Sequence, residues 1–375
     1  MSVGRQPDLG PRVCAEALRF HERRYNGFWT VSSPARVPQR MRRSVMKRVV
    51  YPFAVTLVVV VALASVAAAQ EPWQVPRTAD GHPDLQGVWA NNTATPMQRP
   101  AAFEGKDALT DEELALFRAR AGELRENEQA GNLLGDLLIQ QVLEDPNFRE
   151  FDAGTGNYNS FWLVERELDH RTSLVVDPPT GRIPPITEAA RERRRSLPRP
   201  TGGRADSHER RSLLDRCISY GVPNLLAGYN AYFQIVQAAD HVAVYQELIH
   251  DARVIPIDGT PHLDDSVRQL HGDSRGRWEG DSLVVETTNY SARGAYRGAT
   301  QNVRVVERFT RVADETIEYE VTFDDSDTWG QPWTLMIPLS RSEESIFEYA
   351  CHEGNYAMEG ILAGARVEEA AATQR

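Results

Sequence analysis

The chain has 375 residues, of which 41% are hydrophobic and 25% charged; these ordinary values exclude a wholly disordered chain, a coiled coil and a polytopic membrane protein. The formal net charge of −11 argues against broad nucleic-acid binding, which needs a surplus of Lys and Arg. Residues 1–69 hold 11 basic and 3 acidic side chains, a net of +8, so the rest of the chain carries −19.

The first seventy residues have the features of an export signal. Basic side chains between Arg40 and Arg48 precede an uncharged apolar run at 49–66, and three alanines follow at 67–69. A basic segment, an apolar core and a small-residue cleavage site are the three parts of a secretory signal peptide. An uncleaved anchor is the alternative, because about eighteen apolar residues can just cross a bilayer.

This pattern predicts the organisation of the chain. We expect residues 1–40 to be an extension ahead of the true start, 41–69 to be the signal peptide and 70–375 to be one secreted domain. Within that domain, 70–210 would form a lead-in with helices and 211–366 an antiparallel β meander. The protein would be periplasmic or secreted, with no stable membrane span after cleavage.

Two cysteines remain once the leader is removed. Cys217 and Cys351 would lie in an oxidising compartment, where two cysteines more often form a disulfide than remain free thiols. The alternative is a catalytic thiol at Cys351, which is followed directly by His352.

The part between residues 70 and 210 is predicted to contain most of the helix. Thr110 and Glu113 are spaced as a capping box, and apolar residues follow at helical spacing, so we expect a helix over 111–127. The other expected elements are, in chain order, a strand at 87–90, a helix at 132–144, strands at 162–164 and 173–176, and a helix from 187 to about 196.

From residue 229 onward the hydrophobic period changes to two. Residues 316–323 are the cleanest case, because every second side chain is a large apolar one. Consecutive strands with one apolar face and short turns predict an antiparallel meander. We expect a mainly β protein with an α insert (α+β), whose meander forms a calycin- or lipocalin-like barrel or a strongly curved sheet, with the helices of 110–200 packed outside it or across one end. The expected strands are 233–235, 242–254, 282–290, 303–311, 316–323, 333–339 and 346–351.

Two sets of motifs resemble known families. Gly87-Val88-Trp89 ahead of a meander resembles the G-x-W signature of lipocalins and the wider calycin class, which implies a barrel holding an apolar or amphipathic ligand in an internal cavity. Four longer motifs are similar to a family of exported bacterial proteins, and this similarity implies an intact exported domain over 77–366 without implying an activity. These motifs are DGHPDLQGVW (80–89), IHDAR (249–253), GDSRGRWEGDSLVVETTNY (272–290) and ACHEGNY (350–356).

The first of three polar clusters contains His250, Asp251 and Arg253. On an uninterrupted strand over 242–254, His250 would continue a mostly apolar face with Gln246, whereas Asp251 and Arg253 would lie on the opposite face. An imidazole in such a place titrates near neutrality, which suits general acid–base catalysis. A structural histidine with both nitrogens bonded is the alternative.

The second cluster begins at His271 and contains Asp273, Arg275 and Trp278. Asp273 would orient Arg275 or an imidazole. Arg275 beside Trp278 suits a carboxylate, a sulfate or a sugar ring. The alternative is a polar loop whose Asp–Arg pairs hold a hairpin together.

The third cluster comes directly after the last expected strand. His352 and Glu353 are candidates for a metal site or a proton-transfer pair, because loops on a rigid scaffold often carry function. Asn355 in this cluster and Tyr229, at the start of the meander, are the remaining candidate ligand contacts. A turn held by a disulfide at Cys351 is the alternative.

The sequence does not identify a cofactor. A divalent metal held by His250, His271 or His352 is conceivable, but the chain has no H-x-H, H-E-x-x-H or C-x-x-C spacing. G-x-S-x-G, Gly-rich phosphate loops and a dinucleotide fingerprint are also absent, which disfavours serine hydrolases of that fold, kinases and NAD enzymes.

These clusters predict an exported small-molecule enzyme that uses His–carboxylate acid–base chemistry as a hydrolase, lyase or isomerase on an organic or sugar-like substrate. The alternative is a non-catalytic, lipocalin-like periplasmic carrier, which needs an internal cavity. The expected roles are acid or base for His250, orientation for Asp251 or Asp273, anion contact for Arg253 or Arg275, and a second proton-transfer unit at His352 and Glu353.

Overall fold

The computed structural model describes residues 73–126, 166–196, 205, 207–225 and 227–373. The chain divides into two units, 1–70 and 71–375, and every described residue belongs to the second. The expected extension and signal peptide, the helix at 132–144 and the strand at 162–164 lie outside the described residues.

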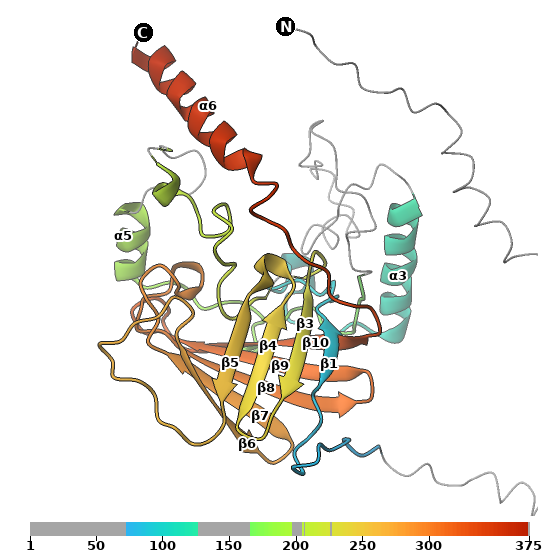
Figure 1. Cartoon of the computed structure of the whole chain (residues 1–375). Helices are drawn as coiled ribbons and strands as arrows, with labels where there is room; N and C mark the ends of the chain where they lie inside the picture. Colours follow the sequence, from blue (N-terminus) through green and yellow to red (C-terminus); the bar gives the residue numbers. More distant parts are fainter. Residues whose placement is uncertain (1–72, 127–165, 197–204, 206, 226, 374–375) are drawn as a thin grey trace, which may run out of the picture. The chain divides into compact units, whose positions relative to one another are not determined.

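The described part is built around a ten-stranded antiparallel sheet (Figure 1). Its hydrogen-bonded order is β5-β4-β3-β1-β10-β9-β8-β7-β6, and β2 pairs with β10 off this path. The strands are β1 (Gly87–Ala90), β2 (Val175–Asp177), β3 (Tyr232–Gln237), β4 (His241–Gln246), β5 (Ala252–Pro256), β6 (Asp273–Glu279), β7 (Ser282–Thr288), β8 (Arg304–Ala313), β9 (Thr316–Asp324) and β10 (Trp333–Ser342).

The sheet curves strongly without closing into a hydrogen-bonded barrel. β5 and β6 are its two edges, and no ladder joins them. They nevertheless come close, because a Cβ added at Gly276 on β6 would lie 3.0 Å from Cγ2 of Ile255 on β5. The predicted antiparallel, strongly curved sheet is therefore confirmed.

Alternating side chains place the core on the inner face of this sheet. In β9, Ile317, Tyr319, Val321 and Phe323 are buried, while the residues between them are partly exposed, as the period-two pattern predicts. β8 and β10 show the same alternation, and their inward apolar side chains join those of β3, β4 and β7 in one core.

The predicted helix starts are confirmed. In α3 (Asp111–Glu126), Thr110 Oγ1 accepts the Glu113 N–H at 3.2 Å and Glu113 Oε2 accepts the Thr110 N–H at 2.8 Å, which is a capping box. In α5 (Glu188–Ser196), Thr187 Oγ1 accepts the Ala190 N–H at 3.1 Å. Short 3-10 helices are η1 (Ala101–Phe103), η3 (His208–Arg210), η4 (Leu248–His250) and η5 (Tyr296–Gly298).

A C-terminal helix, α6 (Tyr356–Thr373), was not predicted from the sequence. It has no buried residue, so no contact with the core of the described structure orients this helix. Of the helices in the described residues, none is long and apolar enough to cross a bilayer.

Three predictions about the strands are wrong. The expected strand 242–254 is a hairpin, because Ile249 and His250 adopt left-handed φ values of 64° and 50° in η4 and reverse the chain between β4 and β5. His250 is therefore exposed instead of continuing the apolar face. Residues 346–351 form no strand, and residues 273–279, for which no strand was expected, form the edge strand β6.

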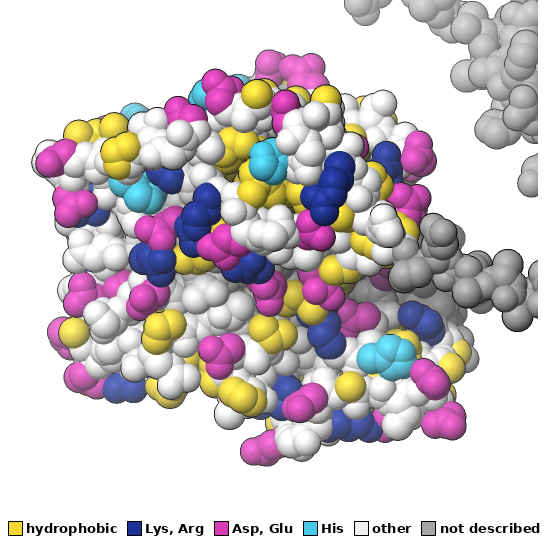
Figure 2. All heavy atoms as spheres, turned by 90° about the horizontal axis from the view of Figure 1, so that it is seen from below, with side chains coloured by type: hydrophobic (Ala, Val, Ile, Leu, Met, Phe, Trp, Pro, Cys, Tyr) yellow, Lys and Arg dark blue, Asp and Glu magenta, His cyan; other side chains and the backbone are white. Residues whose placement is uncertain are grey.

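The antiparallel topology gathers many loops at one end of the sheet. β1, β4, β7 and β9 finish there, and β3, β5, β6, β8 and β10 begin there. We call this the site end. The face seen from below in Figure 2 instead shows basic and acidic side chains interspersed, in agreement with ion pairs such as Arg308–Glu279 at 2.7 Å.

Candidate functional site

Three polar side chains from separate loops meet at the site end. Ser219 precedes β3, Asp251 follows η4 and His271 precedes β6. Ser219 Oγ lies 3.0 Å from Asp251 Oδ2 and 2.7 Å from His271 Nε2. The curvature that brings β5 and β6 together also brings Asp251 and His271 together, with 3.7 Å between Oδ2 and Nε2. We call these residues the Ser–His–Asp cluster.

The hydrogen bonds of Ser219 fix the protonation of His271. The hydroxyl has one proton, which it donates to Asp251, and its oxygen accepts the Gly221 N–H at 2.8 Å. The 2.7 Å contact with His271 must then be donated by Nε2–H. Nδ1 has no hydrogen-bond partner among the described residues. When the His271 ring is neutral, this arrangement leaves the basic lone pair on Nδ1.

The electrostatics of the cluster agree with this assignment. Burial lowers the pKa of His271, the Asp251 carboxylate opposes that effect, and the nearby Arg253 guanidinium adds to it. Burial raises the pKa of Asp251 against the opposing influence of His271, Ser219 and His250. The His271 side chain keeps 26% of its surface exposed, so the imidazole is accessible from solvent. A neutral, accessible and oriented imidazole is suited to general-base catalysis near pH 7.

Unusual backbone conformations surround the cluster. Four non-glycine residues in these loops have a left-handed φ: Cys217 (54°), Ile249 (64°), His250 (50°) and Asn289 (57°). Such conformations persist only when the surrounding structure imposes them, and they concentrate at functional sites. Their gathering in the loops of one sheet end supports the assignment of this end as the site.

A glycine allows the loop of His271 to approach the sheet. Gly272 has φ +70°, and a Cβ there would lie 2.6 Å from the Thr288 carbonyl oxygen and 3.1 Å from Tyr290 Cζ. Any side chain at this position would push the loop away from β7. Gly272 therefore sets the depth at which His271 enters the site.

The predicted disulfide is confirmed and joins the third cluster to this site. Cys217 and Cys351 are bonded, with their Cα atoms 5.7 Å apart. Asn355 Nδ2 donates to the Asp215 carbonyl oxygen at 2.9 Å and to Cys217 Sγ at 3.3 Å. Asn355 is thus a structural contact of the Ser219 segment. His352 and Glu353, by contrast, have exposed side chains.

His250 lies beside the cluster without belonging to it. Its Nδ1 is 3.1 Å from the Tyr349 carbonyl oxygen, and its side chain is exposed. Tyr229, another candidate contact, lies at the site end just before β3 and is partly exposed. The acid–base role expected for His250 is geometrically better met by His271, which the sequence indicated only as a metal candidate.

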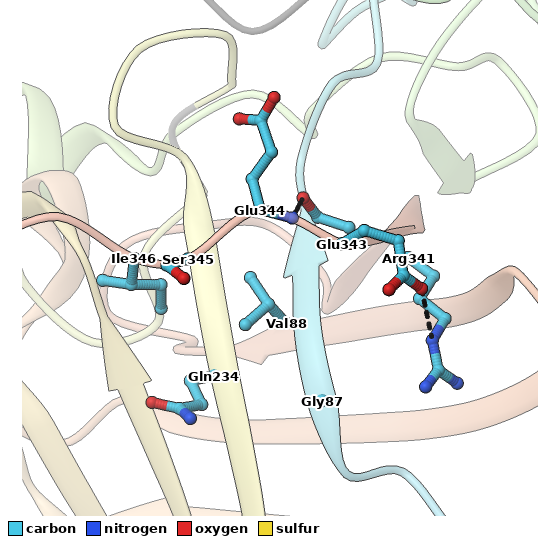
Figure 3. Close-up of a pocket in the computed structure, with 9 residues that line it drawn as sticks. Gly87, Val88, Gln234, Arg341, Glu343, Glu344, Ser345 and Ile346 are labelled. Atoms are coloured by element: carbon cyan, nitrogen blue, oxygen red, sulfur yellow. Dashed lines mark hydrogen bonds and ion pairs between the residues drawn. The ribbon is translucent and has the colours of Figure 1, made fainter.

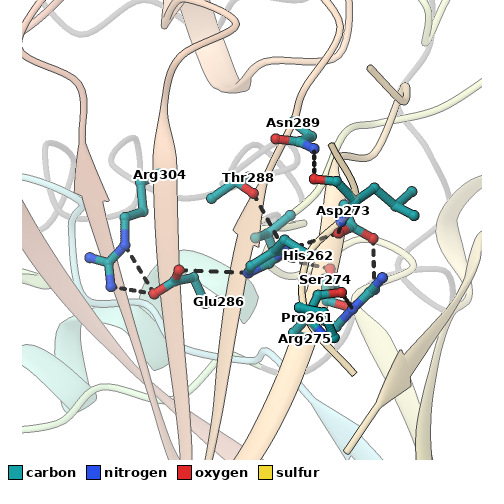
Figure 4. A network of polar contacts seen from close by, with 11 residues as sticks. Pro261, His262, Asp273, Ser274, Arg275, Glu286, Thr288, Asn289 and Arg304 are labelled. Atoms are coloured by element: carbon teal, nitrogen blue, oxygen red, sulfur yellow. Dashed lines mark hydrogen bonds and ion pairs between the residues drawn. The ribbon is translucent and has the colours of Figure 1, made fainter. Parts of the chain in front are cut away.

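Asp273 and Arg275 belong to a different network (Figure 4). The buried Asp273 carboxylate accepts from Arg275 Nη1 at 2.6 Å and from the Leu263 N–H at 2.9 Å, and it lies 3.0 Å from His262 Nδ1. His262 Nε2 in turn lies 3.6 Å from Glu286 on β7. These contacts tie the loop before β6 to the sheet, so Asp273 and Arg275 are engaged in holding this loop.

Trp278 and Arg253 are also engaged within the protein. Trp278 stacks on His82 near the β6–β7 turn, with ring centroids 4.9 Å apart, at the end opposite the site. Arg253 points into the curved sheet, where Nη2 donates to Glu307 Oε1 at 2.8 Å and Nη1 also contacts this carboxylate. Tyr319 donates to the same carboxylate at 2.6 Å. The expected anion contact at Arg253 is thus occupied by Glu307.

This ion pair lies in a nearly filled interior. The cavity beside Arg253 and Tyr319 measures about 10 Å³, which is room for one water at most. Organic ligands occupy sites of about 300–1,000 Å³. The described interior therefore lends no support to an internal ligand cavity of the lipocalin kind.

A separate groove of about 400 Å³ lies on the outer face of the sheet (Figure 3). The segment 343–346 crosses β1 and β3 there, with Val88 and Gln234 below it and Arg341 paired with Glu343. Its volume suits a small ligand, but the described residues that line it include no histidine. The groove therefore offers no imidazole for acid–base chemistry, whereas the Ser–His–Asp cluster does.

Within the described residues, the side chains predicted to hold a metal are not brought together. Across the described ranges, no group of three or more His, Cys, Asp and Glu side chains is arranged to hold a metal ion. Of the three candidate histidines, only His271 lies in the cluster, while His250 and His352 are exposed beside it.

Sequence reasoning missed Ser219 and paired Asp251 with His250, whereas the structure brings Asp251 to Ser219 and His271. Ser219 lies two residues after Cys217 and two before Gly221, and the disulfide was the available sign that this segment is held at a fixed place. No spacing motif links Ser219, Asp251 and His271, because loops 20 or more residues apart meet only through the curvature of the sheet.

We expect His271 to titrate below about 6.5, the ordinary imidazole value, since burial disfavours its charged form. Asp251→Asn should lower the pKa of His271 further, because the opposing carboxylate charge is lost. As the pH falls from about 6.5 to the folded pKa, the unfolded chain binds a proton that folded His271 does not, so stability decreases. Nitrogen-15 NMR titration of the imidazole checks this, and a value above 6.5 would contradict the assigned burial.

Comparisons of this chain with family models, with curated proteins and with solved structures give no match. A functional inference for this chain therefore depends on the geometry of the Ser–His–Asp cluster.

Proposed function

We propose that this chain is an exported small-molecule hydrolase in which His271 is the general base. The observation that carries the proposal is the fixed His271 ring, with Nε2–H donated to Ser219 Oγ at 2.7 Å and Nδ1 left free. One imidazole nitrogen is oriented here by the Ser219 hydroxyl, which is itself bonded to the Asp251 carboxylate, while the other nitrogen is available to exchange protons. The basic, apolar and small-residue segments at 40–69 support export, and the disulfide fits an oxidising compartment.

The proposed reaction uses water as the second substrate. His271 Nδ1 removes a proton from water while the water oxygen bonds to an electrophilic carbon such as an ester carbonyl. The tetrahedral intermediate then expels its leaving group, and the imidazolium returns the proton to the leaving group or to solvent. Asp251 stabilises the transient imidazolium. Ser219, which is only 1% exposed, acts as a positioning residue and not as a nucleophile.

Hydrolysis of 4-nitrophenyl acetate by the purified protein near pH 7 tests this proposal. We expect His271→Gln to lower the second-order rate constant about 100-fold, in the range of one general base. His352→Gln is the matched control, since His352 is an exposed histidine outside the cluster, and it should leave the rate within about twofold. Ser219→Ala should lower the rate less than His271→Gln, because only the orientation of the ring is lost.

Two results would contradict the proposal. Equal rates for the wild type and His271→Gln would remove His271 from the chemistry. Loss of activity in His352→Gln with a folded protein would move the base to that exposed histidine. Circular dichroism of each variant separates these outcomes from unfolding.

A further inference from the structure

The Cys217–Cys351 disulfide connects the segments that carry the Ser–His–Asp cluster. Cys217 lies two residues before Ser219. On the other side of the bond, Tyr349 lies two residues before Cys351, and its carbonyl oxygen is 3.1 Å from Nδ1 of His250, the residue before Asp251. Residues 349–351 are therefore attached to both the Ser219 and the Asp251 segments.

The backbone at Cys217 is held in an unfavourable conformation. Its φ of 54° is left-handed, which residues with a Cβ adopt only under constraint. The disulfide and the Asn355 hydrogen bonds to Asp215 and Cys217 contribute to that constraint, together with backbone hydrogen bonds from Cys217 and Ile218 to the preceding turn. Breaking the disulfide would allow Cys217 to relax, and Ser219 would move with it.

The two sulfur atoms differ in environment. Cys351 is partly exposed, whereas Cys217 is 4% exposed. Asn355 Nδ2 donates to Cys217 Sγ at 3.3 Å, and a hydrogen-bond donor stabilises the thiolate over the thiol. Thiol–disulfide exchange is faster when the attacked sulfur is accessible and the departing sulfur is a stabilised thiolate. This asymmetry favours attack at Cys351 with Cys217 as the leaving group.

We propose that the Cys217–Cys351 disulfide is a redox-labile clasp, whose reduction by a dithiol disengages Ser219 from His271 and switches the site off. A thiolate of the dithiol bonds to Cys351 Sγ, the Cys217–Cys351 bond breaks, and its electron pair leaves on Cys217. The second thiol of the reagent then displaces Cys351, so that the dithiol becomes a disulfide and the protein gains two electrons and two thiols. The catalytic consequence rests on the proposed function, while the clasp itself does not.

Native-state reduction with dithiothreitol tests the clasp. Mass-tagging of thiols follows the reduction, nitrogen-15 NMR follows the His271 imidazole, and circular dichroism monitors the fold. We expect reduction without denaturant, and a change in the His271 tautomer and pKa toward those of an exposed histidine. The rate of 4-nitrophenyl acetate hydrolysis should fall about tenfold, as for loss of a positioning contact.

Two variants control this experiment. Asn355→Ala removes the donor to Cys217, so the disulfide should be reduced several-fold more slowly. The double variant Cys217→Ser, Cys351→Ser should show the reduced-state His271 spectrum whether or not dithiothreitol is present. If the double variant does not fold, the wild type reduced under native conditions carries the test.

The outcomes separate the clasp from the proposed function. A disulfide that resists dithiothreitol until the protein unfolds, or an unchanged His271 spectrum after reduction, would overturn the clasp. A His271 spectrum that responds to reduction, in a protein whose oxidised form hydrolyses no more than His271→Gln, would support the clasp while refuting the proposed hydrolase.

Discussion

Replacing Glu307 by Gln should destabilise the protein by about 3–5 kcal/mol, the range for breaking one side of a buried ion pair. The Arg253 side chain is 8% exposed and that of Glu307 0%, so neither charge can turn to water. Burial alone would lower the pKa of Arg253, but the Glu307 carboxylate outweighs burial and raises it. Without Glu307 the guanidinium would remain charged in an apolar interior. Urea unfolding measures the loss.

A double variant separates the effect of the Arg253–Glu307 interaction from the effects of the two single substitutions. Arg253→Met with Glu307→Leu removes both charges. This double variant should be destabilised less than Arg253→Met alone or Glu307→Leu alone, because no unpaired charge is left. Arg308→Met is the matched control, since the Arg308–Glu279 pair lies at the surface and should matter far less. Additive single changes would show that Arg253 and Glu307 do not interact in solution.

Trp89→Ala should cost about 3–5 kcal/mol, the usual range for emptying a buried tryptophan site. Trp89 is fully buried, and its Nε1 donates to the Leu85 carbonyl oxygen at 2.9 Å. The Arg311 guanidinium lies 5.5 Å from the centre of its ring and donates to the Asp84 carbonyl oxygen at 2.8 Å. Loss of the indole would leave a cavity and deprive this cation of its aromatic partner.

Trp73 provides a control for Trp89, because it is 43% exposed in the same N-terminal part of the domain. Trp73→Ala should change the free energy of unfolding by less than about 0.5 kcal/mol, as surface substitutions do. Trp89→Phe keeps most of the ring and should cost less than Trp89→Ala. Equal midpoints of urea unfolding for Trp89→Ala and Trp73→Ala would show that Trp89 does not anchor β1.

The sequence was most informative where local chemistry decides the structure. The capping box of Thr110 and Glu113 predicted the start of α3, and the alternation of residues 316–323 predicted β9 and its buried face. The two cysteines that follow residue 70 predicted their own pairing. These features depend on a few neighbouring residues or on a simple count, so no tertiary information is needed.

Local patterns failed where a single backbone angle changes the outcome. The alternation of residues 242–254 indicates one strand, but the left-handed Ile249 and His250 turn it into a hairpin. Arg253 consequently points inward and His250 outward, which reverses the faces expected from the period. A non-glycine residue in the left-handed region has no reliable sequence signal, since tertiary contacts hold it there.

An antiparallel β domain with a disulfide could be predicted from the sequence, and Asp251 and His271 were among the polar residues that it indicated. Ser219 joins them through tertiary contacts, and Asp273, Arg275 and Trp278 make their contacts elsewhere in the fold. The reason is physical: strand alternation and caps act between near neighbours, whereas the cluster joins segments that come together through the curvature of a ten-stranded sheet whose two edges nearly meet.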